Sequence, residues 1–298
     1  MKKAIGIDIG GTKVAFGLLD EKQELVSQLE LASNPTDRQL MYEVVESGIK
    51  KILEMNQIHE EDVSFGIGVP GVVDSEKGIA VFQSNLPWEN FPLAEKLRET
   101  FPGVARIKLD NDVVQAAFAE WQALRLTKRD SLVFLTVSTG VASPILIGGN
   151  PVRGEGVSGE IGLLPVWNPI MNRLERLEEA ASGVAIAAYG KKLYQDPEMT
   201  TKEVFERYWQ KDAIAVEIVE SIVCSLAHGI YGIGCLLDPT KIVLGGSVVL
   251  KNPFILDLLK AKLSEMIIPV QSHLIDSLVL SQYDNTAGLV GAALSVAI

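Results

Sequence analysis

The chain has 298 residues, of which 47% are hydrophobic, and a formal net charge of −11 at pH 7. The length predicts two domains, the apolar content excludes a disordered chain, and the negative charge argues against nucleic acid or an anionic membrane as partner. Two cysteines, Cys224 and Cys235, are too few for a disulfide framework and favour a reducing cytoplasm. Residues 132–149 come closest to a membrane span, but their Thr, Ser and Pro residues predict strand, loop and strand.

The first 19 residues predict a β-hairpin. Isoleucines alternate at positions 5, 7 and 9, Gly10 and Gly11 predict a tight turn, and residues 14–19 predict the second strand. Two glycines let backbone N–H groups approach an anion, while Thr12 and Lys13 add a hydroxyl and a positive charge. Asp8 adds a carboxylate that suits magnesium, directly or through water. An ordinary hairpin whose glycines only satisfy the turn explains the same residues.

The first half then alternates helix and strand. Apolar spacing predicts a helix over 38–55, a buried strand over 63–69, a polar loop and helix over 85–100, and a short strand over 106–109. Asn111 and Asp112 follow that strand and open a helix over 113–124. An acid at the carboxyl end of a strand is where α/β proteins place reactive groups, although helix capping alone also explains Asp112.

The second half begins like the first. Residues 131–137 predict a strand, 138–140 a turn with Thr139 and Gly140, and 145–147 a second strand, which indicates a duplication with two turns facing one phosphate chain. A glycine-rich loop over 154–162 carries Glu160, and a helical region is expected from residue 174 onward.

Three features close the chain. An apolar helix is predicted over 221–237, and its His228 is expected to be a core residue with a polar partner. A buried strand over 241–244 runs into Gly245 and Gly246 ahead of a helix, where a nucleotide would lie against backbone. Small residues over 287–296 predict a closely packed helix.

Taken in order, the motifs resemble the ROK family of sugar kinases over essentially the whole chain. The matching stretches are residues 8–13 (DIGGTK), 66–74 (GIGVPGVVD), 111–112 (ND), 159–162 (GEIG), 177–183 (LEEAASG) and 244–246 (LGG). The resemblance implies an α/β, actin-like ATPase (ribonuclease H-like) fold with a duplicated core and a hinged cleft. The expected division is a small domain of residues 1–112 with 285–298, and a large domain of residues 113–284.

The resemblance also implies residue roles. Asp112 would be the general base that takes the proton of the attacking sugar hydroxyl. The sugar would be bound by Asn85, Asn111, Asp112, Glu160, Glu178 and Gly71. Asp8, Gly10, Gly11, Thr12, Lys13, Thr139 and Gly140 would hold the phosphates of ATP and magnesium, and Gly245 and Gly246 the nucleoside.

The chain departs from the family at several positions. Leu163 stands where a histidine is usual, and residues 165–176 contain no cysteine, so no zinc site is expected. We expect apolar packing of the segment to replace the zinc, and Trp167→Ala to destabilise it; its candidate side chains, several at helical spacing, are Leu164, Val166, Trp167, Ile170, Met171, Leu174 and Leu177. The second turn has Ala142, Ser143 and Pro144 where glycines are common, and Ser247 replaces a third glycine.

The resulting prediction is a cytoplasmic, homodimeric, ATP- and magnesium-dependent hexose kinase that phosphorylates the 6-hydroxyl, with glucose as lead substrate. N-acetylmannosamine and β-glucosides are alternative substrates. A sugar-binding protein of the same fold with little or no turnover is the alternative of another class.

Overall fold

The computed structural model describes residues 3–297, which divide into two compact units. Unit 1 comprises residues up to Arg125 together with the C-terminal segment from Asn285, and unit 2 comprises Leu126–Asp284. The sequence-based division placed residues 113–125 in the second domain. In the structure they belong to unit 1, because their helix packs closely against the C-terminal helix.

Unit 1 is built on a five-stranded sheet of order β3-β2-β1-β4-β8. Its strands are β1 (Lys3–Ile9), β2 (Lys13–Leu19), β3 (Leu25–Ala32), β4 (Val63–Val69) and β8 (Ile107–Asn111). β1 and β2 form the predicted hairpin, while β1, β4 and β8 run parallel to one another. A smaller sheet contains β5 (Val72–Asp74), β6 (Ile79–Phe82) and β7 (Glu89–Phe91).

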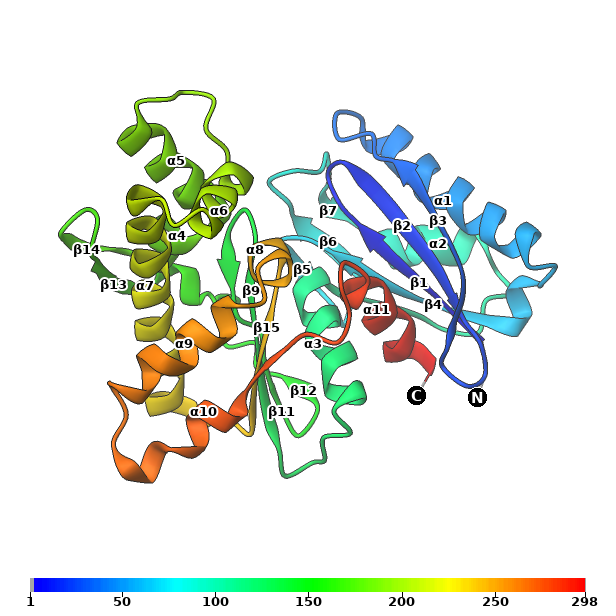
Figure 1. Ribbon diagram of the computed structural model, residues 1–298. Coiled ribbons are helices and arrows are strands. Elements are labelled where there is room, and N and C mark those ends of the chain that lie inside the picture. The colour runs from blue at the N-terminus through cyan, green and yellow to red at the C-terminus, as the bar shows by residue number, and fades with distance from the viewer. Residues whose placement is uncertain (1–2, 298) are drawn as a thin grey trace. The chain divides into compact units, whose positions relative to one another are not determined.

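Helices cover both faces of the larger sheet of unit 1 (Figure 1). One face is covered by α1 (Arg38–Met55) and α2 (Leu93–Thr100). α1 packs so closely on the sheet that a Cβ atom on Gly48 would collide with the Phe16 ring. A 3₁₀ turn, η1 (Glu60–Asp62), leads into β4. The other face is covered by α3 (Asp112–Ala123) and α11 (Ala287–Ala297). α11 lies directly on the strands, because a Cβ on Gly6 would come 2.1 Å from the carbonyl oxygen of Leu289. The close packing predicted for this small-residue helix is confirmed.

Unit 2 is built on a second sheet of order β12-β11-β9-β15-β16, with β10 paired to β9. The strands are β9 (Ser131–Val137), β10 (Val141–Ala142), β11 (Ile145–Ile147), β12 (Asn150–Pro151), β15 (Lys241–Gly245) and β16 (Leu278–Leu280). β9, β15 and β16 are parallel, and β10 and β11 return antiparallel to β9. The strand–turn–strand unit predicted to repeat the first hairpin is therefore present.

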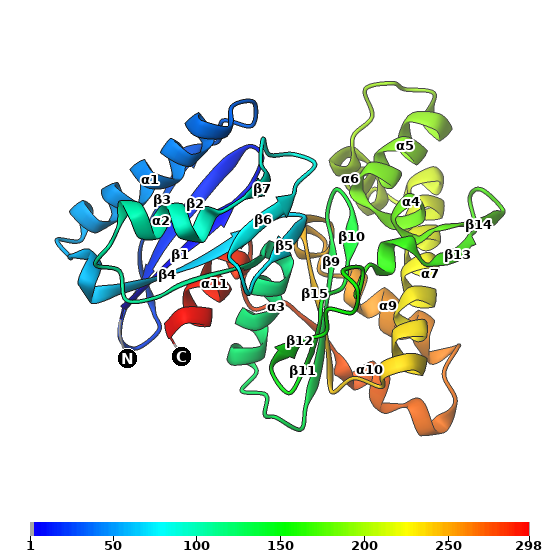
Figure 2. The ribbon, with the colours of Figure 1, turned by 180° about the vertical axis from the view of Figure 1, so that it is seen from behind.

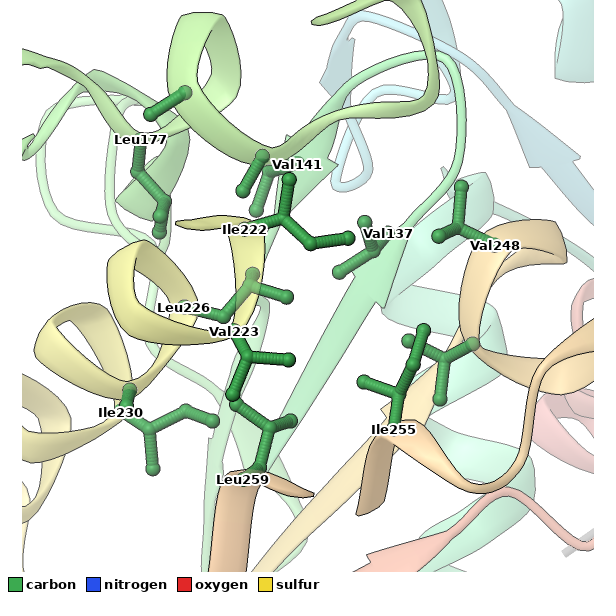
Figure 3. Close-up of a cluster of buried hydrophobic side chains, with 14 of the residues drawn as sticks. Val137, Val141, Leu177, Ile222, Val223, Leu226, Ile230, Val248, Ile255 and Leu259 are labelled. Carbon is green, nitrogen blue, oxygen red and sulfur yellow. The ribbon is translucent and has the colours of Figure 1, made fainter. Parts of the chain in front are cut away.

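The long helix α7 (Ala213–Leu237) is contacted by α4 (Leu177–Ala181), α5 (Gly183–Tyr194), α6 (Thr201–Trp209) and α9 (Ile255–Ser264), as Figures 1 and 2 show from both sides. Unit 2 also contains α8 (Ser247–Lys251), which lies against β9 and β15, α10 (His273–Ser277), and the 3₁₀ turns η2 (Ile161–Leu163) and η3 (Pro269–Gln271). Figure 3 shows side chains of α7 meeting those of the sheet and the other helices; its labels include Ile222, Leu226, Ile230, Val137, Leu177, Val248 and Leu259.

α7 is also the one helix among residues 3–297 that is long and apolar enough to cross a membrane. Residues 132–149, which come closest to a span in the sequence, fall on β9, β10 and β11 and their connections, as their Thr, Ser and Pro residues predict. In the structure, 61% of the most apolar window of α7 is buried, as in the core helix of a globular domain. Its His228 donates a hydrogen bond of 2.8 Å from Nδ1 to the Cys224 carbonyl, so the expected polar partner is present.

The segment between residues 165 and 176 corrects two expectations. It is a β-hairpin of β13 (Pro165–Asn168) and β14 (Arg173–Arg176), although several of its apolar residues occur at helical spacing, and the helical region begins at Leu177 rather than at residue 174. Alternation along the strands buries Val166 but leaves Trp167 42% and Leu174 66% exposed. Trp167 therefore cannot carry the packing assigned to it.

Candidate functional site

The parallel strands of unit 1 end at one edge of the sheet, and this edge carries the predicted acidic residues. Asp8 on β1 lies in register with Gly68 on β4, and Gly68 lies in register with Asp110 on β8. A Cβ atom placed on Gly68 would lie 3.6 Å from Asp8 Oδ1 and 3.2 Å from Asp112 Cα. The fold thus brings Asp8 and Asp112 together across a position that has no side chain.

Burial is the largest influence on the pKa of both carboxyl groups. Burial, and then the negative charge of Asp112, raise the pKa of Asp8 to about 7, against the opposing effect of Lys13. Burial also raises the pKa of Asp112, although the backbone N–H groups of Val113 and of Asp112 itself partly oppose this. Carboxylate oxygens are the ligands that magnesium prefers, and magnesium commonly completes its shell with water and phosphate. Asp8 therefore fits the predicted magnesium role.

The first turn is ordered by hydrogen bonds within unit 1. Gly10 N–H donates to the Lys13 carbonyl at 2.9 Å, and the Ser33 hydroxyl donates to the Gly10 carbonyl at 2.6 Å. The Lys13 ammonium group pairs with Glu30 on β3, while Thr12 is exposed. The Lys13 charge is thus shared with a carboxylate, which the sequence did not indicate.

Two predicted sugar-binding residues lie against glycines of the same unit. A Cβ on Gly11 would come 2.8 Å from the Asn85 carbonyl oxygen, so the loop that carries Asn85 rests on the first turn. Gly71 has a φ of +78°, which favours glycine, and its carbonyl accepts a hydrogen bond of 3.0 Å from Asn111 Nδ2. Beside Gly71, the buried Gln83 has a side-chain oxygen that finds no hydrogen-bond partner within residues 3–297.

Asn111 holds the start of α3. Its Oδ1 accepts the backbone N–H groups of Val113 and Val114 at 3.1 and 3.2 Å, as expected of an N-cap. The capping alternative therefore applies to Asn111, and Asp112 is the first residue of the helix. The Asp112 Oδ1 atom accepts a hydrogen bond of 2.9 Å from the Val113 N–H.

In unit 2, the second turn lies against Glu178. Glu178 Oε2 accepts the Val141 N–H at 2.9 Å, and a Cβ on Gly140 would come 2.4 Å from the same oxygen. Burial and the charge of Glu178 both raise the pKa of Glu160, so these two carboxyl groups are also neighbours. The turn with Thr139 and both acidic candidates of unit 2 therefore form one cluster.

A cavity of about 960 Å³ opens in unit 2 beside that turn. Its lining includes Ser138 and Thr139, the start of α5, one side of α6, and α8 from Ser247. Gly246, just before Ser247, has a φ of +84°, and a Cβ there would lie 2.3 Å from the Val137 carbonyl oxygen. The backbone between β15 and α8 therefore comes close to β9, beside this cavity.

The cavity also has lining residues that the motifs did not indicate. α5 and α6 contribute Lys191, Thr201, Lys202 and Trp209, and α8 contributes Lys251. No glycine or charge pattern marks them in the sequence, because they come together only when three helices pack. Within residues 3–297 there is no group of three or more His, Cys, Asp or Glu residues placed to hold a metal ion.

The comparisons with known proteins cover nearly the whole chain. The model of the ROK family matches residues 4–297. An N-acetylmannosamine kinase of Shigella boydii is 32% identical over 97% of both chains, and a glucokinase of Streptomyces coelicolor is 26% identical over 98% of this chain and 97% of its own. The crystal structure of a ROK family glucokinase from Streptomyces griseus, in complex with glucose and AMPPNP, is 26% identical, covers 98% of both chains and has a TM-score of 0.77.

This match in three dimensions agrees with the two sheets, the repeated strand–turn–strand units and the motif order described above. The fold is therefore the actin-like ATPase fold of the ROK sugar kinases. Because the family model spans residues 4–297, the chain belongs to the ROK family.

Proposed function

We propose that this protein is a sugar kinase that transfers the γ-phosphate of ATP to the 6-hydroxyl of a hexose, with glucose as lead substrate. The names of its relatives, glucokinase and N-acetylmannosamine kinase, and the glucose–AMPPNP complex of the Streptomyces griseus enzyme support this class of reaction. The observation that carries the proposal is Asp112, a partly buried carboxyl group with a raised pKa at the start of α3, beside Asn111.

In the proposed reaction, Asp112 accepts the proton of the 6-hydroxyl while that oxygen forms a bond to the γ-phosphorus. The bond between the γ-phosphorus and its bridging oxygen breaks, and ADP leaves. The raised pKa makes Asp112 a better proton acceptor than an ordinary carboxylate, provided that it is ionised. Bound magnesium, which Asp8 would hold directly or through water, would neutralise charge on the phosphates.

We assign the binding of sugar and nucleotide to residues of both units. Asn85, Asn111 and Gly71 of unit 1, and Glu160 and Glu178 of unit 2, would bind the sugar hydroxyls. The turns at Gly10–Lys13 and Thr139–Gly140 would hold the phosphates, and Gly245 and Gly246 the nucleoside. In line with the family resemblance, we also propose a homodimer in the cytoplasm. It would require no zinc, because the segment after residue 162 departs from the family and lacks the histidine and cysteine ligands.

The identity of the sugar is open to direct measurement. ADP release over a panel containing glucose, N-acetylmannosamine and aryl β-glucosides should give the highest kcat/KM for glucose. N-acetylmannosamine is the second candidate, because relatives that are 32% identical carry that name. A sugar-binding protein without turnover would bind a sugar of the panel and release no ADP above background.

Asp112→Asn tests the mechanism. Turnover should fall to background while the melting temperature and sugar affinity stay close to those of the unmodified protein. Asp37→Asn is a matched control, because Asp37 caps α1 on the same unit without belonging to the proposed site. A variant of Asp112 that keeps most of the activity would contradict the assignment of the general base.

A further inference from the structure

The four tryptophans of the chain differ widely in exposure. Trp88 and Trp121 are 2% and 4% exposed, whereas Trp167 is 42% and Trp209 is 65% exposed. Trp209 is the last residue of α6, and it lines the 960 Å³ cavity of unit 2, which Trp167 does not. An indole left accessible at the wall of a large cavity offers a flat apolar surface to a ligand.

The indole of Trp209 is held by other rings. Its ring centroid lies 4.7 Å from that of Phe254 at an interplanar angle of 69°, and 5.8 Å from that of Tyr208 at 73°. Tyr208 stacks on Phe254 at 4.9 Å, and the buried Phe205 reaches Phe254 from a third side at 6.2 Å. These contacts join α6 to the turn between α8 and α9, so the orientation of the exposed ring is set before any ligand binds.

The remaining walls of the cavity indicate what kind of ligand it takes. Its lining includes Ser138 and Thr139 of the second turn and Ser247 at the start of α8. Lys191 and Lys251 add two positive charges against the one negative charge of Glu198, whereas Lys202 is paired with Glu206 at 3.4 Å. A ligand that fits this combination has an anionic part for the turn and the lysines, and a flat aromatic part for the indole.

We propose that Trp209 is the stacking platform for the base of the phosphoryl donor. This proposal rests on the proposed function, which makes the donor a nucleoside triphosphate. It adds the residue against which the base of that donor stacks. Stacking of a base on an aromatic side chain is largely independent of base identity. Trp209 therefore supports binding of purine nucleotides in general and contributes nothing to a donor that lacks a base.

Binding of ADP and of pyrophosphate, measured by calorimetry without sugar or turnover, separates these contributions. Trp209→Ala should weaken ADP binding by about 10-fold or more and leave pyrophosphate binding unchanged. Trp209→Phe should recover most of the ADP affinity, because phenylalanine keeps a stacking ring. Trp167→Ala is the control, because Trp167 is an exposed tryptophan of the same unit that does not line the cavity. This variant should bind both probes like the unmodified protein.

A second measurement reports on the ring itself. ADP should change the tryptophan fluorescence of the unmodified protein and of Trp167→Ala, and this change should disappear in Trp209→Phe. ADP affinity that survives Trp209→Ala unchanged, with normal kinase activity, overturns the stacking role alone. An unmodified protein that binds pyrophosphate but not ADP, and releases no ADP with any sugar, overturns both this role and the proposed donor.

Discussion

The side-chain amide of Asn168 donates a hydrogen bond of 2.7 Å to the hydroxyl of Tyr189, joining the β13–β14 hairpin to α5. Asn168 is fully buried, and its amide also donates to Glu175 at 2.6 Å while its oxygen accepts the Met171 N–H at 3.2 Å. Tyr189 in turn donates to the Glu179 carbonyl on α4 at 2.9 Å. A polar network therefore fastens the segment in which the sequence analysis expected apolar packing.

The network should make Asn168 important for stability. Asn168→Ala should lower the free energy of unfolding by about 2–4 kcal/mol, because buried partners in the hairpin and on α5 lose their hydrogen bonds. Trp167→Ala, one residue away, should cost less than about 1 kcal/mol, since the indole is largely exposed. Urea unfolding of both variants checks the pair. Equal losses, or the larger loss at Trp167, would restore the packing explanation.

The same network should position Glu178. Burial raises the pKa of Tyr189 to about 12, so its hydroxyl stays protonated and donates to α4, which carries Glu178. If Glu178 binds sugar as proposed, Tyr189→Phe should raise the KM for sugar about 10-fold while the KM for ATP and kcat change little. Tyr194→Phe is the control, because Tyr194 lies on the same helix as Tyr189 but its hydroxyl donates a hydrogen bond to Asp212 and not to α4. Parallel changes in both Michaelis constants would indicate a general structural role.

The carboxyl pair of unit 1 should give a measurable pH dependence of stability. The pKa of Asp8 is about 7 in the folded protein and 3.8 is its ordinary value, so the folded state binds the proton more tightly. Stability is then highest below the unfolded pKa and is lost as the pH rises through 7. Between pH 5.5 and 8 the loss should be about 2 kcal/mol for Asp8.

Urea unfolding of the protein and of Asp8→Asn at these two pH values isolates that contribution. The variant lacks the titrating carboxyl group but keeps Asp112. Between the two pH values its free energy of unfolding should therefore fall by about 2 kcal/mol less than that of the unmodified protein. Magnesium at pH 8 should stabilise the unmodified protein and have little effect on the variant. The same pH slope in both proteins would show that Asp8 ionises as an ordinary carboxyl group.

The sequence predicted the elements whose signals are local. The hairpin around Gly10 and Gly11, the helix over 38–55 and the strand before Gly245 appear where glycine pairs, apolar spacing and strand length placed them. The hairpin over 165–176 was not predicted, and the helical region was expected from residue 174 instead of Leu177, because a short run with mixed apolar residues fits a helix period as well as strand alternation. Asn168 could not be recognised, since nothing in the sequence indicates that a lone asparagine will meet a tyrosine 21 positions later.

In the candidate site, too, local signals were recognised in the sequence and contacts between distant residues were not. Motifs placed Asp8, Asn111 and Asp112 at strand ends, and the parallel register then brings Asp8 beside Asp112. The cavity residue Trp209 had no motif, because its surroundings arise from helices packed on helices. The pairing of Lys13 with Glu30 depends on the register of β2 with β3, which the sequence analysis did not predict.

The turn that contains Thr139 and Gly140 lies against Glu178. A Cβ atom on Gly140 would come 2.4 Å from Glu178 Oε2, which is closer than carbon and oxygen can approach, so Gly140→Ala must displace this carboxylate or the turn. Either shift would disturb the hydrogen bond that Glu178 Oε2 accepts from Val141 N–H and the neighbouring acidic group of Glu160. We expect kcat/KM for the sugar to fall by about 100-fold, the size of effect that a displacement of about 1 Å produces.

Gly232→Ala is the control for this substitution. Its Cβ would meet only Leu164 Cδ2, at an ordinary contact distance of 3.6 Å, inside the same unit. Alanine in the interior of α7 should leave activity unchanged and stabilise the helix by up to about 1 kcal/mol. Steady-state kinetics and thermal unfolding of both variants decide the matter. A Gly140→Ala protein with unaltered kinetics would mean that Glu178 and the turn can move apart without consequence, and would remove Glu178 from the proposed sugar site.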